Sequence, residues 1–271
     1  MLRADPAPVS TPFLLLATQR TGSSWVQEML SSHPGVKVYT ELFIAQASGS
    51  PLWEPSDVEF ANTYWEAHAR RPRRVTRHYW TVRYLQRVFD QPQCAAVGFK
   101  YMYDQVRRSP PVLPYAAARR VRVVHLIRHN LLDSVISNQR ALHTGVFHLA
   151  ADGRPPIPWA PADFDRSKIR LEPAQVLGEL RRLLRERERV RRWLKLTRTP
   201  TLEVHYETLV ADRGRFAEIL EFLGVPEPDP AHLRSGLQKI RTEPRAAVVE
   251  NLPELEAALA ATPFAPFLAG G

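Results

Sequence analysis

The sequence predicts an α/β protein in which one mostly parallel central sheet is flanked by helices. Short apolar segments, each of strand length, recur along the chain at 13–17, 36–39, 95–100, 119–127 and 201–205. Segments with helical spacing lie between them, and the longest runs from 173 to 196. Strands that alternate with helices are typical of a parallel, doubly wound sheet. We therefore expect a loose polar tail at residues 1–11 and a single domain over residues 12–271.

The composition is that of an ordinary globular protein. Of 271 residues, 44% are hydrophobic and 24% are charged, which disfavours disorder. The apolar run Phe13–Ala17 is far shorter than the roughly 20 residues that a transmembrane helix needs, and no basic leader precedes it. The single cysteine, Cys94, fits a reducing compartment. We expect a cytoplasmic protein with no transmembrane segment.

The net charge of +9 suits a nucleic acid, an anionic surface or a polyanionic small molecule as partner. The most basic run, 181–192, is interleaved with Glu179, Glu186 and Glu188 at helical spacings. Such a pattern is typical of a solvated helix face. We therefore do not expect nucleic-acid binding.

The turn Gln19–Ser24 lies between the first predicted strand and a helix that begins near Trp25. Backbone N–H groups at a helix N-terminus point outward, and the helix dipole favours an anion there. Gly22 lets the backbone approach a ligand, while Ser23 and Ser24 supply hydroxyl groups. The turn predicts a P-loop-like anion site, although an ordinary capped helix start would give a similar pattern.

The turn differs from the ATP-binding P-loop motif in the position of its positively charged residue. Aligned with the P-loop motif, Ser23 stands where the lysine is required and Ala17 stands where the first glycine is required. The cation lies inside the loop instead, at Arg20. This departure disfavours a nucleotide kinase.

The segment Arg20–Trp25, followed by Leu30–Gly35 and by Glu41, resembles the 5′-phosphosulfate loop of the sulfotransferases. The similarity is greatest to the bacterial carbohydrate branch, which includes Nod-factor and trehalose 2-sulfotransferases. The resemblance implies that the donor is 3′-phosphoadenosine-5′-phosphosulfate (PAPS), with no metal required. The residues it implies for holding the 5′ end of PAPS are Gln19, Arg20, Thr21, Gly22, Ser23 and Ser24.

PAPS also carries a 3′-phosphate, which needs a second anion site. Arg128 ends a predicted strand, and Ser137 follows nine positions later in the next predicted helix. An arginine presents a planar fork to a phosphate and a serine hydroxyl completes the grip. The pair resembles the 3′-phosphate motif of the family, in the spacing of its carbohydrate branch.

Sulfuryl transfer needs a base for the acceptor hydroxyl and stabilisation of the leaving oxygen. We expect Arg20 and Ser24 to stabilise the leaving oxygen. Glu41 is the expected base, because it follows a short strand beside the donor turn and the resembling branch has a glutamate there. A helix-capping or salt-bridged surface role for Glu41 and a base at His129 are the alternatives.

Other positions carry weaker resemblance. Lys100 is expected near the active cleft, and the pair Tyr206-Glu207 is expected to have a packing role. Lys239 and Arg241 resemble the segment that closes over the nucleotide, although ordinary solvent-exposed charges fit them equally well.

The ranges 46–94 and 141–170 match no pattern and are expected to be acceptor-side insertions. The expected acceptor is a hydroxyl of a sugar, a glycolipid or a natural product, and aromatic side chains in 53–89 suit ring stacking. The sequence does not distinguish a monomer from a homodimer. A P-loop-like kinase and a non-catalytic basic anion-binding module remain the competing functions.

Overall fold

The computed structural model describes residues 10–44, 64, 76–108, 111–145, 149–150, 167–226, 229–238 and 244–269. The predicted tail lies almost wholly outside these residues, as does much of the two predicted insertions.

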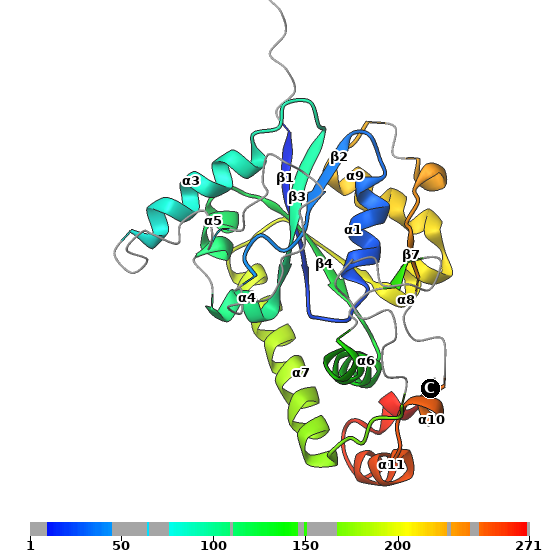
Figure 1. Cartoon of the computed structure of the whole chain (residues 1–271). Helices are drawn as coiled ribbons and strands as arrows, with labels where there is room; N and C mark the ends of the chain where they lie inside the picture. Colours follow the sequence, from blue (N-terminus) through cyan, green and yellow to red (C-terminus); the bar gives the residue numbers. More distant parts are fainter. Residues whose placement is uncertain are drawn as a thin grey trace, which may run out of the picture.

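Five parallel strands form the central sheet in the order β2-β3-β1-β4-β6. Figure 1 shows this sheet flanked by helices. The predicted single α/β domain with a parallel sheet is confirmed. The strands are β1 (Thr11–Ala17), β2 (Val36–Tyr39), β3 (Ala96–Met102), β4 (Arg122–Ile127) and β6 (Thr201–His205).

The central strand is β1, with β2 and β3 on one side of it and β4 and β6 on the other. In doubly wound sheets, ligands bind outside the carboxyl ends of the strands, at the point where the strand order reverses. Here that point is the end of β1, where the Gln19–Ser24 turn begins. Every residue of Phe13–Ala17 is buried, because helices cover both faces of the sheet.

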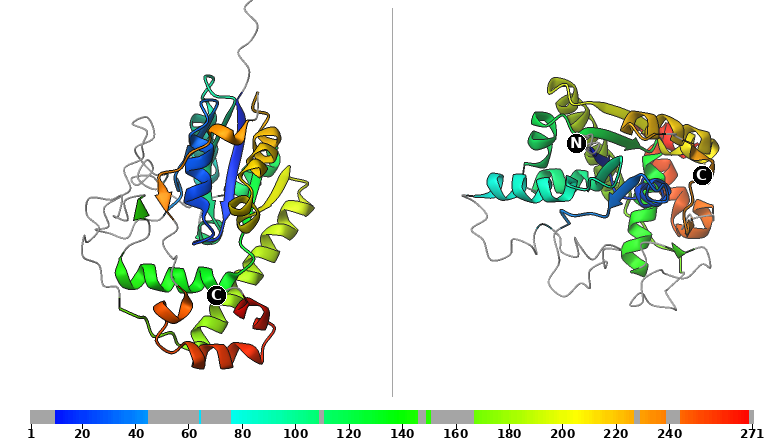
Figure 2. Two further views of the ribbon diagram at one scale, coloured as in Figure 1. Left: turned by 90° about the vertical axis from the view of Figure 1, so that its right-hand side faces the viewer. Right: turned by 90° about the horizontal axis from the view of Figure 1, so that it is seen from above.

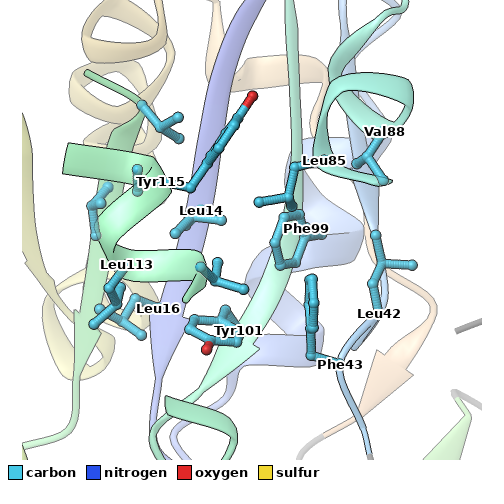
Figure 3. Packing of buried hydrophobic residues seen from close by; sticks show 14 of the residues in the cluster. Leu14, Leu16, Leu42, Phe43, Leu85, Val88, Phe99, Tyr101, Leu113 and Tyr115 are labelled. Carbon is cyan, nitrogen blue, oxygen red and sulfur yellow. The ribbon is translucent and has the colours of Figure 1, made fainter. Parts of the chain in front are cut away.

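Helices on the two faces bury different side chains of the same strands. Leu14 and Leu16 of β1 pack on one face with aromatic residues of β3 and with α3, α5 and α7, as Figure 3 shows in part. Phe13 and Leu15 pack on the other face with α1, α8 and α9. The helices are α1 (Ser23–Ser31), α3 (Arg77–Phe89), α4 (Tyr103–Arg108), α5 (Val112–Ala118), α7 (Pro173–Leu196), α8 (Tyr206–Ala211) and α9 (Phe216–Leu223).

A third cluster lies beyond the carboxyl ends of the strands. There α6 (Leu131–Thr144) packs against the first half of α7 and the C-terminal helices α10 (Arg245–Val248) and α11 (Leu252–Ala260). Figures 1 and 2 show these helices together at one end of the sheet. The remaining elements are β5 (Leu149–Ala150), β7 (Leu237–Gln238) and the 3₁₀ turns η2 (Arg213–Arg215), η3 (Pro230–His232) and η4 (Ala265–Leu268).

Two differences from the prediction concern the start of the domain and the first predicted insertion. The first strand starts at Thr11, and Ser10 is already buried, with its hydroxyl donating to the carbonyl oxygens of Gln91 and Cys94. Within the range expected to be an insertion, α3 packs Leu85 and Val88 fully into the core. This helix therefore stabilises the sheet, whatever role the rest of the range has.

The helix at 173–196 is confirmed with its predicted bounds. Arg181 and Arg185 are exposed, as expected for a solvated face. Glu186 is buried instead and pairs with Arg182 at 2.9 Å and with Arg107 of α4 at 3.2 Å. This part of the basic run thus joins two helices.

A buried polar network crosses the carboxyl half of the sheet. His125 of β4 is completely buried, and its Nε2 atom contacts the Tyr103 hydroxyl while its Nδ1 atom lies 3.4 Å from Glu203 of β6. Arg191 of α7 donates to both oxygens of Glu203. The His125 ring and these bonds from Arg191 hold the pKa of the Glu203 carboxyl at about 2, below its ordinary value of 4.5.

We expect Glu203→Gln to make the stability of the protein less sensitive to acid. A carboxyl group whose pKa is lowered by folding stabilises the folded state fully above its unfolded value, and this contribution is lost as the pH falls toward about 2. Because the variant lacks this contribution, its melting temperature should lie furthest below that of the wild type near neutral pH. The difference should shrink at about pH 3; a constant difference would contradict the linkage.

Candidate active site

The Gln19–Ser24 turn connects β1 to α1 through two residues in the left-handed conformation, Arg20 (φ 63°) and Gly22 (φ 82°). A non-glycine residue pays about 1–2 kcal/mol for this conformation, so other contacts must hold Arg20 in place. Gly22 is required for a second reason. A Cβ atom there would lie 2.3 Å from Cε2 of Tyr206. The tyrosine ring packs so closely on the turn that a side chain at this position would clash with it.

The N-terminus of α1 offers backbone donors to a ligand. The first hydrogen bond of the helix runs from the Val26 N–H to the Gly22 carbonyl at 3.1 Å, and no side chain caps this end within the described part of the chain. The N–H groups of the first turn have no partner within the helix. This is the geometry that binds phosphate and sulfate groups.

Arg20, Arg128 and Ser137 lie together beside the turn. Nε of Arg20 donates to the Ser137 hydroxyl at 3.1 Å, and Nη1 of Arg128 donates to the Arg20 carbonyl at 3.0 Å. The Ser134 hydroxyl donates to the same carbonyl at 3.3 Å. These contacts hold Arg20 in its strained conformation and place two arginines next to each other.

The positive charges of the two adjacent arginines repel each other, and this repulsion favours the binding of an anion. Burial, and then the charge of Arg128, lower the pKa of Arg20 from its ordinary value to about 10. Arg20 therefore stays charged at neutral pH although its surroundings disfavour the charge. A bound anion relieves both the desolvation and the repulsion.

Arg128 is oriented by residues from two helices, α6 and α8. Its guanidinium lies 5.2 Å from the ring centroid of Tyr206, a cation–π distance. Nη2 lies 3.7 Å from Asp133 of α6, and Nε lies 4.0 Å from Glu207 of α8. The Tyr206-Glu207 pair, expected to have a packing role, thus contacts both the turn and Arg128.

Asp133 also joins this site to the C-terminal segment. Nε of Arg245 donates to Asp133 at 3.0 Å, and Arg245 is 3% exposed. The other two nitrogens of Arg245 donate to the carbonyls of Leu268 and Phe267. The packing of the C-terminal segment is therefore linked to the position of Arg128.

A second cluster connects the turn to Glu41. Nζ of Lys100, on β3, lies 2.9 Å from the Ser24 hydroxyl and 3.3 Å from Glu41 Oε1. The second oxygen of Glu41 accepts from the Gln105 side chain at 2.7 Å. Lys100, expected near the active cleft, thus lies beside the turn. The turn lacks the lysine of the ATP-binding P-loop, and Lys100 brings one from β3, the strand next to β1.

The side chains of Gln19 and Thr21 also make contacts within the fold. The Gln19 amide donates to Asp104 of α4, and the Thr21 hydroxyl donates to the Thr18 carbonyl at 2.8 Å. Any contact of Thr21 with a ligand would therefore come from its backbone. Lys239 and Arg241 lie outside the described residues.

His129, the alternative base, stacks on His205, with ring centroids 4.1 Å apart and planes 1° apart. Its backbone N–H donates to Glu207. Burial, and then the neighbouring His129, lower the pKa of His205.

Among the described residues, no group of three or more His, Cys, Asp or Glu side chains is placed to hold a metal ion. In the same part of the chain, no helix is long and apolar enough to span a bilayer.

The fold and the turn define an α/β protein of the P-loop-like class, with two arginines paired beside the Gln19–Ser24 turn. The model of the sulfotransferase family matches residues 12–229, and the chain belongs to this family. The matched range includes Arg20, Glu41, Arg128 and Ser137 and ends before Lys239.

Two solved structures are similar to this chain. One is a sulfotransferase from Alicyclobacillus acidocaldarius, with 17% identity, a TM-score of 0.47 and coverage of 98% of this chain and 94% of that one. The other is the sulfotransferase domain from the curacin biosynthetic pathway, with 11% identity, a TM-score of 0.45 and coverage of 88% and 82%. No curated protein matches the chain.

Proposed function

We propose that this member of the sulfotransferase family transfers the sulfuryl group of PAPS to an acceptor hydroxyl. The observation that carries the proposal is the pair Arg20 and Arg128, joined through the Arg20 carbonyl and lying at the N-terminus of α1. Such a pair suits a ligand with more than one anionic group. PAPS has a 5′-phosphosulfate and a 3′-phosphate.

The two ends of PAPS are assigned to two parts of this surface. Backbone N–H groups of the turn, with Ser23 and Ser24, hold the 5′-phosphosulfate, while Arg128 and Ser137 hold the 3′-phosphate. The bond from Arg20 to Ser137 makes the two parts contiguous. A ligand with both groups would compete for that bond and free the Arg20 guanidinium for the leaving oxygen.

The reaction that fits this geometry is an in-line displacement at sulfur. Glu41 takes the proton of the acceptor hydroxyl while the acceptor oxygen forms its bond to sulfur. The bond from sulfur to the bridging oxygen breaks, and the electron pair leaves on adenosine 3′,5′-bisphosphate. Arg20, Ser24 and Lys100 stabilise that oxygen, because donors fixed in place act most strongly where charge develops.

The proposed acceptors are a sugar, a glycolipid or a natural product, as in the bacterial carbohydrate branch. No metal ion takes part in the proposed step, since the sulfuryl group carries less charge than a phosphoryl group. Lys239 and Arg241 are proposed to reach the nucleotide from the C-terminal segment, and the protein is proposed to act in the cytoplasm.

Titration with adenosine 3′,5′-bisphosphate tests the proposal without knowledge of the acceptor. Calorimetry in the presence of a metal chelator should give micromolar binding, because the paired arginines and the helix N-terminus need no cation to bind the nucleotide. Adenosine 5′-monophosphate, which lacks the 3′-phosphate, is the matched control and should bind much more weakly. Tighter binding of Mg-ATP would favour a kinase, and no nucleotide binding would favour a basic binding module.

A further inference from the structure

Gln105 lies at the first turn of α4, next to the proposed base. It is 3% exposed. Its Oε1 accepts from the Met102 backbone N–H at 3.3 Å, and its Nε2 donates to Glu41 Oε2 at 2.7 Å. The side chain therefore joins the end of β3 to the carboxylate of Glu41.

The orientation of this amide follows from its partners. Met102 precedes the first residue of α4 and Gln105 is the third, so the bond to the Met102 N–H is half of a capping box. A backbone N–H can only donate, which forces the amide oxygen toward Met102. The amide NH₂ group must then face Glu41, whose ionised carboxylate can only accept.

Glu41 is fixed by two different donors. Lys100 contacts one oxygen at 3.3 Å and Gln105 contacts the other at 2.7 Å. Lys100 also contacts the Ser24 hydroxyl in the Gln19–Ser24 turn. A Lys100 variant would therefore disturb the proposed PAPS site as well as Glu41. Within the described residues, the hydrogen bonds of the Gln105 side chain go to Met102 and Glu41 and not to the turn. Its neighbour Asp104 accepts from Gln19 in the turn instead.

We propose that Gln105 is a positioning residue for Glu41, a proposal that rests on Glu41 being the base of the proposed sulfuryl transfer. The bond from the Met102 N–H holds the amide, and the amide holds the plane of the carboxylate. One lone pair of Glu41 Oε2 accepts from Gln105, and the carboxylate keeps other lone pairs for the acceptor proton. Alignment of a base within a fraction of an ångström has a large effect on rate.

The test is a double-mutant cycle on turnover, with PAPS as donor and a panel of simple sugars and phenols as acceptors. Gln105→Met keeps the length of the side chain and removes the donor. We expect kcat to fall roughly 10-fold to 100-fold, with an unchanged KM for PAPS and unchanged affinity for adenosine 3′,5′-bisphosphate. The exposed Gln93→Met is the matched control and should leave both kcat and KM unchanged.

In the background of Glu41→Gln, Gln105→Met should produce no further fall in the residual rate, because there is no longer a base to align. Multiplicative losses in the double variant would overturn the proposal, since they would mean that Gln105 acts independently of Glu41. Unchanged kcat in Gln105→Met would overturn it as well. If Gln105→Met does not fold, Gln105→Glu preserves the shape and the acceptor for Met102 and should lower kcat by repelling Glu41.

Failure of the proposed function has a different signature. A wild-type protein that neither binds adenosine 3′,5′-bisphosphate nor releases it from PAPS would refute sulfuryl transfer itself. A wild type that turns over, together with a fully active Glu41→Gln variant, would refute the base. The Gln105 variants test the positioning role separately from the sulfuryl transfer and from the identity of the base.

Discussion

Replacement of Glu41 by glutamine should lower turnover by about 10²–10⁴-fold, the contribution that a general base makes to a proton transfer. The glutamine side chain has nearly the same shape as that of glutamate, and it retains an oxygen that can accept from Lys100 or from Gln105. It cannot take the acceptor proton. The measurement is the rate of adenosine 3′,5′-bisphosphate release from PAPS with the acceptor panel, together with the affinity for that nucleotide.

The affinity for the nucleotide should change little in this variant, since among the described residues Glu41 is linked to the turn through Lys100 and makes no direct bond to it. Glu218→Gln, an exposed carboxylate of α9 that pairs with Arg215, is a suitable control and should behave as the wild type. A Glu41→Gln variant with unchanged turnover, beside an inactive His129→Gln variant, would move the base to His129. It would also return Glu41 to the salt-bridge role that the sequence left open.

The sequence was sufficient to predict the sheet and the turn because both depend on local patterns. A fully buried parallel strand appears as a continuous apolar run, and Phe13–Ala17 is such a run. Gly22 marks the left-handed position that follows it. Arg128 and Ser137 could be found for a similar reason, since a strand end and the next helix lie on one short stretch of chain.

The residues that hold the site in place come from long-range packing, which one sequence does not show. Tyr206, the first residue of α8, lies against Gly22 although most of the chain separates the two residues. Asp133 and Arg245 pair across 112 positions. Gln105 was missed because α4 has only six residues, too few for a helical pattern to indicate which side chain faces Glu41.

Replacement of Arg128 by alanine should weaken the binding of PAPS roughly 10-fold to 100-fold, the effect of losing a charged hydrogen bond. The binding of adenosine 5′-phosphosulfate, which lacks the 3′-phosphate, should change by a much smaller factor. The comparison is necessary because Arg128 also donates to the Arg20 carbonyl and contacts the Tyr206 ring. Loss of these contacts perturbs the turn and affects both ligands alike.

The ratio of the two affinities therefore isolates the 3′-phosphate from the turn. Arg122→Ala is the matched control, because Arg122 stands at the opposite end of the same strand and donates to the Phe222 carbonyl. This control should leave both affinities unchanged. Equal losses for the two ligands in Arg128→Ala would mean that Arg128 supports the turn without contacting the 3′-phosphate. That task would then fall to Ser137 and to cations from another segment.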